Sequence, residues 1–109
     1  MSKAKGNIAE EKAYDFLYEK GFVIIEQNFY SRFGEIDIIA TKNDVLHFVE
    51  VKSADDYEKA TQNINKAKIS KLIKTGDIYM KKNAFNGDFQ YDAVIVTPNK
   101  IWHIENITI

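Results

Sequence analysis

The sequence predicts an α/β fold, with a central mixed β-sheet flanked by helices. A helical apolar pattern opens the chain, and three strand-like segments follow it. A long basic helical segment then separates these strands from two further strand-like segments. The 109 residues contain no internal repeat or linker, so residues 1–109 are expected to form one domain.

The first helix is expected over residues 8–20, where one apolar stripe recurs at helical spacing, made of Ala9, Ala13, Phe16 and Leu17. Gly21 is a stop signal for this helix. Strands are then expected over residues 22–25, 35–40 and 45–52. Lys42-Asn43-Asp44 marks a hairpin turn between the last two of these strands.

A second helix is expected over residues 62–82, with an apolar face made of Ile69, Leu72, Ile73, Tyr79 and Met80. The last two strands are expected over residues 91–96 and 101–105. Pro98-Asn99 marks the turn between them.

Composition excludes several kinds of site. The chain has no cysteine, which rules out disulfides, thiolate zinc sites and a cysteine nucleophile. Residues 1–6 are polar, unlike a secretory signal, and no apolar run approaches the ~20 residues that span a bilayer. We therefore expect a cytoplasmic protein with no membrane partner.

The predicted hairpin brings two acids together. If its turn centres on Asn43-Asp44, counting back along both strands places Asp37 opposite Glu50. Directly opposed residues have Cβ atoms about 4.5–5.5 Å apart, and two like charges there destabilise a sheet. Mg²⁺ or Mn²⁺ held by Asp37 and Glu50 would turn that repulsion into attraction. The alternative is that one carboxylate stays protonated.

Two more charged residues extend this candidate catalytic site. Lys52 shares a strand face with Glu50, and its ammonium can orient water and stabilise charge on phosphate oxygens. Glu10 lies at the edge of the apolar stripe of the first helix, whereas Glu11 faces away from that stripe. The alternative interpretation makes Glu50 and Lys52 solvated charges at an exposed strand end, and Glu10 an ordinary boundary glutamate.

A basic segment is the candidate nucleic-acid surface. Residues 59–82 contain seven lysines and one acid. The lysines expected to meet phosphate are Lys66, Lys68, Lys71 and Lys74, together with Arg32, the only arginine. The alternative is a solvated helix face and a surface loop charge. A pI of about 6.1 argues against strong non-specific DNA binding, although a homodimer would present two such surfaces.

Neither histidine is expected to bind a metal. His47 shares a strand face with valines and is expected to be a packed or rim residue. His103 has no histidine or cysteine near it in the sequence, so no zinc site is expected there.

Three sequence blocks carry a family resemblance: Gly6-Asn7-Ile8-Ala9-Glu10, Gly34-Glu35-Ile36-Asp37 and Phe48-Val49-Glu50-Val51-Lys52. With Asn28 and the basic second helix, they resemble the YraN-type family of uncharacterised bacterial proteins. That family is grouped with restriction-endonuclease-like PD-(D/E)xK folds and is similar to archaeal Holliday-junction resolvases. The resemblance implies that Asp37 and Glu50 bind metal, that Lys52 is the catalytic lysine and that Glu10 is a helix-borne carboxylate.

These observations favour a metal-dependent DNA endonuclease that acts on branched or damaged DNA. A second hypothesis is a nucleic-acid-binding or accessory module of the same fold with little or no catalysis. A third is a small α/β protein-interaction domain. The acidic pair and Lys52 favour the first hypothesis over the second, and the basic helix favours the first two over the third.

Overall fold

The computed structural model describes residues 2–108. Its elements in chain order are α1 (Ser2–Glu19), β1 (Val23–Ser31), β2 (Gly34–Lys42), β3 (Val45–Ser53), α2 (Tyr57–Gln62), α3 (Lys66–Lys82), β4 (Asp88–Val96) and β5 (Ile101–Ile104). The strands form a five-stranded sheet in the order β1-β2-β3-β4-β5. β3 and β4 are parallel and the other neighbours antiparallel, which confirms the predicted mixed sheet.

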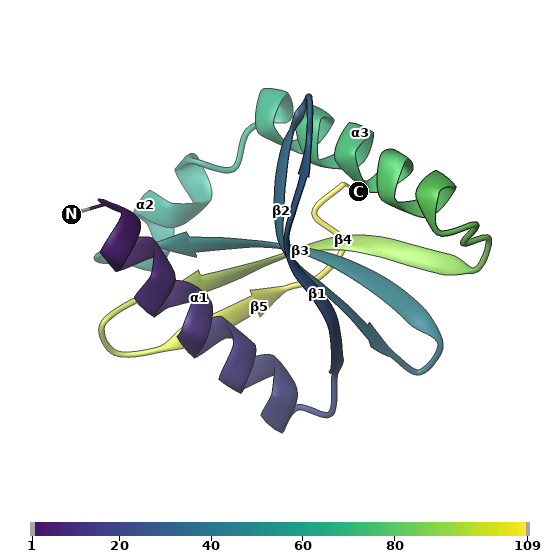
Figure 1. The fold of residues 1–109 in the computed structure, drawn as a ribbon. Helices are drawn as coiled ribbons and strands as arrows, with labels where there is room; N and C mark the ends of the chain where they lie inside the picture. The colour runs from purple at the N-terminus through teal and green to yellow at the C-terminus, as the bar shows by residue number, and fades with distance from the viewer. Residues whose placement is uncertain (1, 109) are drawn as a thin grey trace.

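The two long helices cover opposite faces of the sheet (Figure 1). Side chains alternate along β3, so Val49 packs under α1 with Ala13 and Leu17, whereas Phe48 packs under α3 with Leu72. The predicted apolar stripes of both helices therefore form the core. No helix within residues 2–108 is long and apolar enough to cross a membrane.

The hairpin between β2 and β3 has the predicted register. Asn43 and Asp44 both adopt left-handed φ angles, of 53° and 65°, as a tight two-residue hairpin turn requires. Lys42 pairs with Val45, and the pairing continues inward as far as Ile38 opposite Val49. Asparagine and aspartate tolerate the left-handed region, so this turn sequence is enough to set the register.

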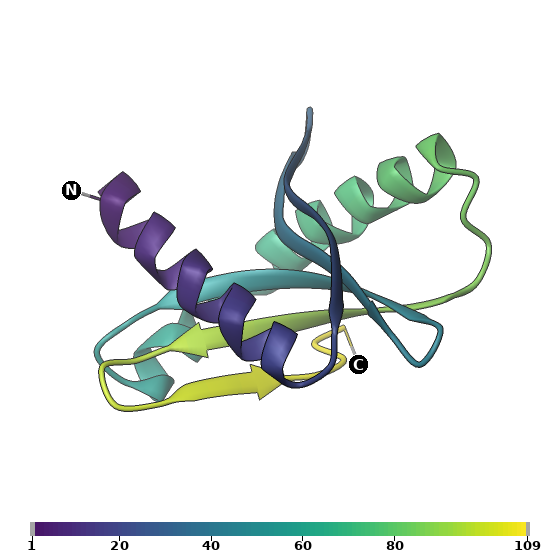
Figure 2. The same ribbon diagram turned by 60° about the horizontal axis from the view of Figure 1, so that its bottom comes forward.

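The sheet forks one residue beyond the last of these pairs. Past Ile38, β2 stays paired only with β1 as far as Gly34, while β3 stays paired only with β4 as far as Ser53. The β1–β2 hairpin leaves the rest of the sheet at this point (Figure 2). Asp37 and Glu50 are the first residues beyond the last pair of β2 and β3. The two acids therefore lie at the point where these strands separate.

The second helix was predicted wrongly as one segment over residues 62–82. The chain forms α2 and α3, with a break at residues 63–65. Each helix starts at a side-chain cap: Asp56 accepts from the Lys59 N–H at 2.8 Å, and Asn65 accepts from the Lys68 N–H at 3.0 Å. The cap at Asn65 satisfies a free N–H of the first turn, so α3 begins at Lys66 and not at the predicted residue 62.

β1, β2 and β4 are each at least three residues longer than predicted. β1 continues to Ser31 instead of ending at residue 25, and β4 begins at Asp88 instead of residue 91. A bulge between Ile24 and Glu26 interrupts the alternation of β1, and most of its side chains are exposed at the sheet edge. Backbone pairing with β2, and not an apolar pattern, therefore determines the length of β1.

Candidate functional site

Asp37 occupies the fork between β2 and β3. Its Oδ2 accepts a hydrogen bond from the Val51 N–H at 2.7 Å, which replaces the ladder bonds that β2 and β3 no longer make. Burial is the main cause that raises the pKa of Asp37 to about 8, and the neighbouring Glu50 carboxylate is the next largest. Without a bound cation, this carboxyl group therefore binds a proton at neutral pH.

Three glutamates complete an acidic group around Asp37, which we call the carboxylate cluster: Glu10, Glu35, Asp37 and Glu50. Glu10 and Glu35 both raise the pKa of Asp37, after burial and Glu50. Burial also raises the pKa of Glu10 and of Glu35. The Glu35 charge raises the pKa of Glu10 further, and the Glu50 charge raises that of Glu35. The structure thus brings together the three acids expected from the sequence. It adds Glu35, to which the sequence analysis gave no role.

Asn28 joins two members of the cluster. It lies on β1 with a left-handed φ of 55°, a conformation that asparagine adopts more readily than most residues. With its amide nitrogen turned toward the acids, the side chain donates to Glu35 Oε2 at 2.6 Å and to Glu10 Oε1 at 3.1 Å. This amide holds the α1 carboxylate close to that of β2.

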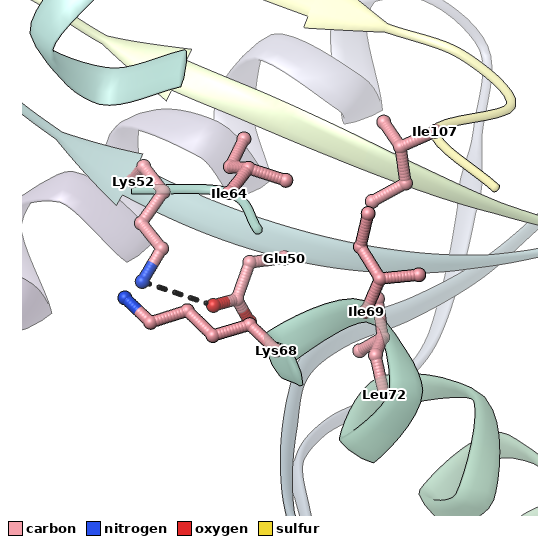
Figure 3. Close-up of a pocket in the computed structure, with 7 residues that line it drawn as sticks. All are labelled: Glu50, Lys52, Ile64, Lys68, Ile69, Leu72 and Ile107. Atoms are coloured by element: carbon pink, nitrogen blue, oxygen red, sulfur yellow. Dashed lines mark ion pairs between the residues drawn. The ribbon is translucent and has the colours of Figure 1, made fainter. Parts of the chain in front are cut away.

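Lys52 lies on the predicted face of β3. Its Nζ is 3.1 Å from Glu50 Oε2, and about a quarter of each side chain is exposed, 24% for Lys52 and 22% for Glu50. Lys68 reaches the same place from α3, so both ammonium groups lie beside the Glu50 carboxylate (Figure 3). An apolar wall of Ile64, Ile69, Leu72 and Ile107 borders these three residues.

The other predicted basic residues separate into two locations. Phe33, in the turn between β1 and β2, has the Arg32 guanidinium 4.8 Å and the Lys74 Nζ 5.2 Å from its ring centroid. A Cβ placed on Gly34 would lie 4.0 Å from Lys71 Cβ, so Lys71 borders the same turn. Lys66 lines another hollow, together with Ile73 and Lys74.

A second group of polar residues lies on the α1 side of β3, β4 and β5. It consists of His47, Asp92 and His103, and we call it the histidine–aspartate cluster. Asp92 is fully buried, and its Oδ2 lies 2.6 Å from His47 Nδ1 and 2.8 Å from His103 Nε2. Its Oδ1 accepts from Gln90 Nε2 at 2.9 Å and from the Asn106 N–H at 3.1 Å.

These four hydrogen bonds determine the charge state of Asp92. Burial alone would raise the pKa of Asp92, but the bonds from His103, His47, Gln90 and the Asn106 N–H outweigh it. They hold the pKa well below its usual range, so Asp92 is an ionised buried carboxylate with both oxygens occupied.

This cluster was not predicted from the sequence, because the residues that surround His103 are distant from it in the chain. His103 lies with its ring centroid 6.4 Å from that of His47, and one ligand-type atom from each of His47, Asp92 and His103 lies within 4.8 Å of the others. His47 is buried and packs edge-on against Phe22, as expected of a packed histidine. The one available signal was Asp92 itself, an acid directly before the apolar end of β4, Ala93-Val94-Ile95-Val96.

Comparison with known proteins identifies the family. Residues 9–96 match the uncharacterised protein family UPF0102. The chain belongs to this family. A UPF0102 protein of Sulfurimonas denitrificans is 68% identical over 109 residues, which cover all of both chains. Those of Aliarcobacter butzleri, with 51% identity over 99% of each chain, and Helicobacter pylori, with 48% identity over 97% of this chain and 92% of the other, are also similar.

The family assignment confirms the resemblance to YraN-type proteins. The UPF0102 match spans the carboxylate cluster, Lys52 and Lys68, whereas it ends at residue 96, before His103 on β5. The name UPF0102 states no activity, so the chemistry of the site has to be argued from its residues.

Proposed function

We propose that this UPF0102 protein is a metal-dependent nuclease that hydrolyses phosphodiester bonds in DNA. The carboxylate cluster carries this proposal, because it holds four acids from α1, β2 and β3 at one fork of the sheet beside Lys52. Gathering like charges destabilises a fold unless something offsets them. A divalent cation is the simplest group that would do so.

The donor atoms suit a hard cation. All four side chains offer carboxylate oxygens, the ligands that Mg²⁺ and Mn²⁺ prefer, and the cluster contains no sulfur or imidazole ligand. Asp37 and Glu50 would hold the ion, with Glu10 and Glu35 close enough to bind it or its waters. When bound, such an ion lowers the pKa of water and offsets charge on phosphate oxygens.

The remaining groups have separate roles in hydrolysis. The oxygen of water bonds to phosphorus, one P–O ester bond breaks, and the leaving oxygen takes up a proton. Glu10 or Glu35 can accept the proton that the attacking water loses. The Lys52 ammonium has no lone pair for a metal, so it positions the water and stabilises charge that develops on the phosphate.

The surroundings of the site favour DNA as the substrate. Arg32, Lys71 and Lys74 border the β1–β2 turn and can meet phosphates that flank the cleaved bond. The resemblance to archaeal Holliday-junction resolvases favours branched DNA. Such a substrate, together with the absence of cysteine, favours the cytoplasm.

The test is cleavage of branched, flapped, nicked and single-stranded DNA with Mg²⁺ or Mn²⁺. We expect Lys52→Ala to lower the single-turnover rate on the order of 100-fold or more, while metal still stabilises the protein. Glu10→Gln should slow cleavage more than its exposed neighbour Glu11→Gln, which is the matched control. Equal rates for wild type and Lys52→Ala would remove the nuclease assignment from this site.

One further outcome would favour the second hypothesis, a nucleic-acid-binding module, over the nuclease. If wild type binds DNA but cleaves none of the substrates with either metal, the protein is a nucleic-acid-binding module that keeps the fold without efficient chemistry.

A further inference from the structure

Two lysines from separate elements meet at the carboxylate cluster. Lys52 comes from the end of β3, and Lys68 comes from the first turn of α3. Both line the hollow that contains Glu50, and their ammonium groups lie on the same side of its carboxylate (Figure 3). The cap by Asn65 places the backbone of Lys68 directly, because it accepts the Lys68 N–H at 3.0 Å.

Two ammonium groups share one carboxylate in this hollow. Glu50 is already paired with Lys52 at 3.1 Å, so a single carboxylate faces two ammonium groups. The proximity of Lys52 is the main cause that lowers the pKa of Lys68, while Glu50 opposes that effect. A cation held by Glu50 would weaken the attraction of Glu50 for both lysines further.

The rest of the hollow offers no competing partner for the lysines. Its other lining residues are isoleucines and a leucine, from the α2–α3 connection, α3 and the chain after β5. Lys68 is exposed and Lys52 is about a quarter exposed, so an anion can reach both ammonium groups from solvent. The anion that a nuclease brings beside its carboxylates is the phosphate under attack.

We propose that Lys68 is a second catalytic lysine, which binds the non-bridging oxygens of the cleaved phosphodiester together with Lys52. This inference rests on the proposed nuclease function and separates Lys68 from Arg32, Lys71 and Lys74, which contact flanking phosphates. Lys68 keeps its proton throughout. It stabilises the negative charge that grows on the phosphate oxygens in the transition state.

Single-turnover cleavage of a branched DNA tests this role, with the rate and the apparent Kd both taken from its dependence on protein concentration. Lys68→Ala should lower the rate about 100-fold and change Kd by less than about threefold, and Lys68→Arg should recover part of the loss. Lys81→Ala is the matched control, since Lys81 is an exposed lysine in the last turn of the same helix and has no role in the site. Equal rates for Lys68→Ala and Lys81→Ala would overturn the proposal.

A binding measurement separates this inference from the nuclease assignment. The dinucleotide d(TpT) is titrated into protein with ¹³Cε-labelled lysine, without metal. The Lys52 and Lys68 signals should shift while the Lys81 signal does not, and Lys68→Ala should weaken the response of Lys52. Shifts without cleavage of any DNA would support the paired-lysine phosphate site and reject hydrolysis. Cleavage by wild type with no shift of the Lys68 signal would reject the second lysine and leave the nuclease intact.

Discussion

Asp37 and Asp92 show how the surroundings of a buried aspartate determine its chemistry. Burial raises the pKa of both, yet Asp37 reaches about 8 while Asp92 falls well below its usual range. Asp92 receives four hydrogen bonds, whereas Asp37 receives one, from the Val51 N–H, and faces three glutamates.

Asp92 therefore has a structural role, whereas Asp37 is suited to bind a ligand. Every lone-pair direction of Asp92 is used by a donor from the chain, so the histidine–aspartate cluster joins β3, β4 and β5 without outside help. The carboxylate cluster has too few donors for its charge, and the missing positive charge has to come from protons or a metal ion. The next four experiments test this contrast.

The largest expected effect is on Asp92. Asp92→Asn replaces an acceptor oxygen by an NH₂ group that faces either the two histidines or Gln90 and the Asn106 N–H, so it should lower the free energy of unfolding by about 2–4 kcal/mol at pH 7. Urea unfolding followed by circular dichroism measures this. Asp88→Asn, an exposed acid on the same strand, should change it by less than about 0.5 kcal/mol.

The pH dependence of that loss has a definite sign. Asp92 has a lowered pKa in the folded state, so its stabilisation is present above the unfolded pKa of about 4. It disappears as the pH falls through the folded pKa. The difference between wild type and Asp92→Asn should therefore shrink below about pH 4, and a constant difference would contradict the ionised state of Asp92.

Metal should act on one cluster and not on the other. Mg²⁺ or Mn²⁺ at 10 to 100 times its Kd should raise the free energy of unfolding of wild type by about 1.4–2.7 kcal/mol. Asp37→Asn and Glu50→Gln should abolish this gain, while Asp92→Asn should keep it. The metal must displace a proton from Asp37, so the gain should be larger at pH 9 than at pH 6. An identical response of all four proteins would place the metal elsewhere.

Removing the charge of Asp37 should stabilise the metal-free protein. Its folded pKa is raised to about 8, so a stability penalty grows as pH rises from about 4 to 8 and stays constant above that. Asp37→Asn should therefore raise the free energy of unfolding at pH 9 in the presence of a chelator, and change it by almost nothing at pH 4. Asp15→Asn, at an exposed site of α1, is the control. A destabilised Asp37→Asn protein at pH 9 would show that the cluster is not repulsive.

The smallest effect concerns the basic residues beside the β1–β2 turn. Lys71→Ala combined with Lys74→Ala removes two phosphate contacts, so the slope of log K against log salt should flatten by about 2. Cleavage rates at saturating protein should change little, in contrast to Lys68→Ala. An unchanged slope would make both lysines solvated charges with no DNA contact.

Local sequence determined the acidic pair at the fork. A two-residue turn at Asn43-Asp44 and the strict alternation of strand side chains are enough to place Asp37 opposite Glu50 and Lys52 on the same face as Glu50. The apolar stripe of α1 likewise oriented Glu10. Each of these predictions depends on residues close together in the chain, where backbone geometry repeats regularly.

Tertiary structure alone decided which distant residues joined that pair. Glu35 enters the cluster because β2 leaves β3 at the fork and the Asn28 amide joins Glu35 to Glu10. Lys68 enters it because α3 begins at the Asn65 cap. His47, Asp92 and His103 meet only when β3, β4 and β5 align in one sheet. Sequence periodicity tells which face a side chain takes on its own element. The distance between two elements depends on how their surfaces pack, and no local pattern contains that information.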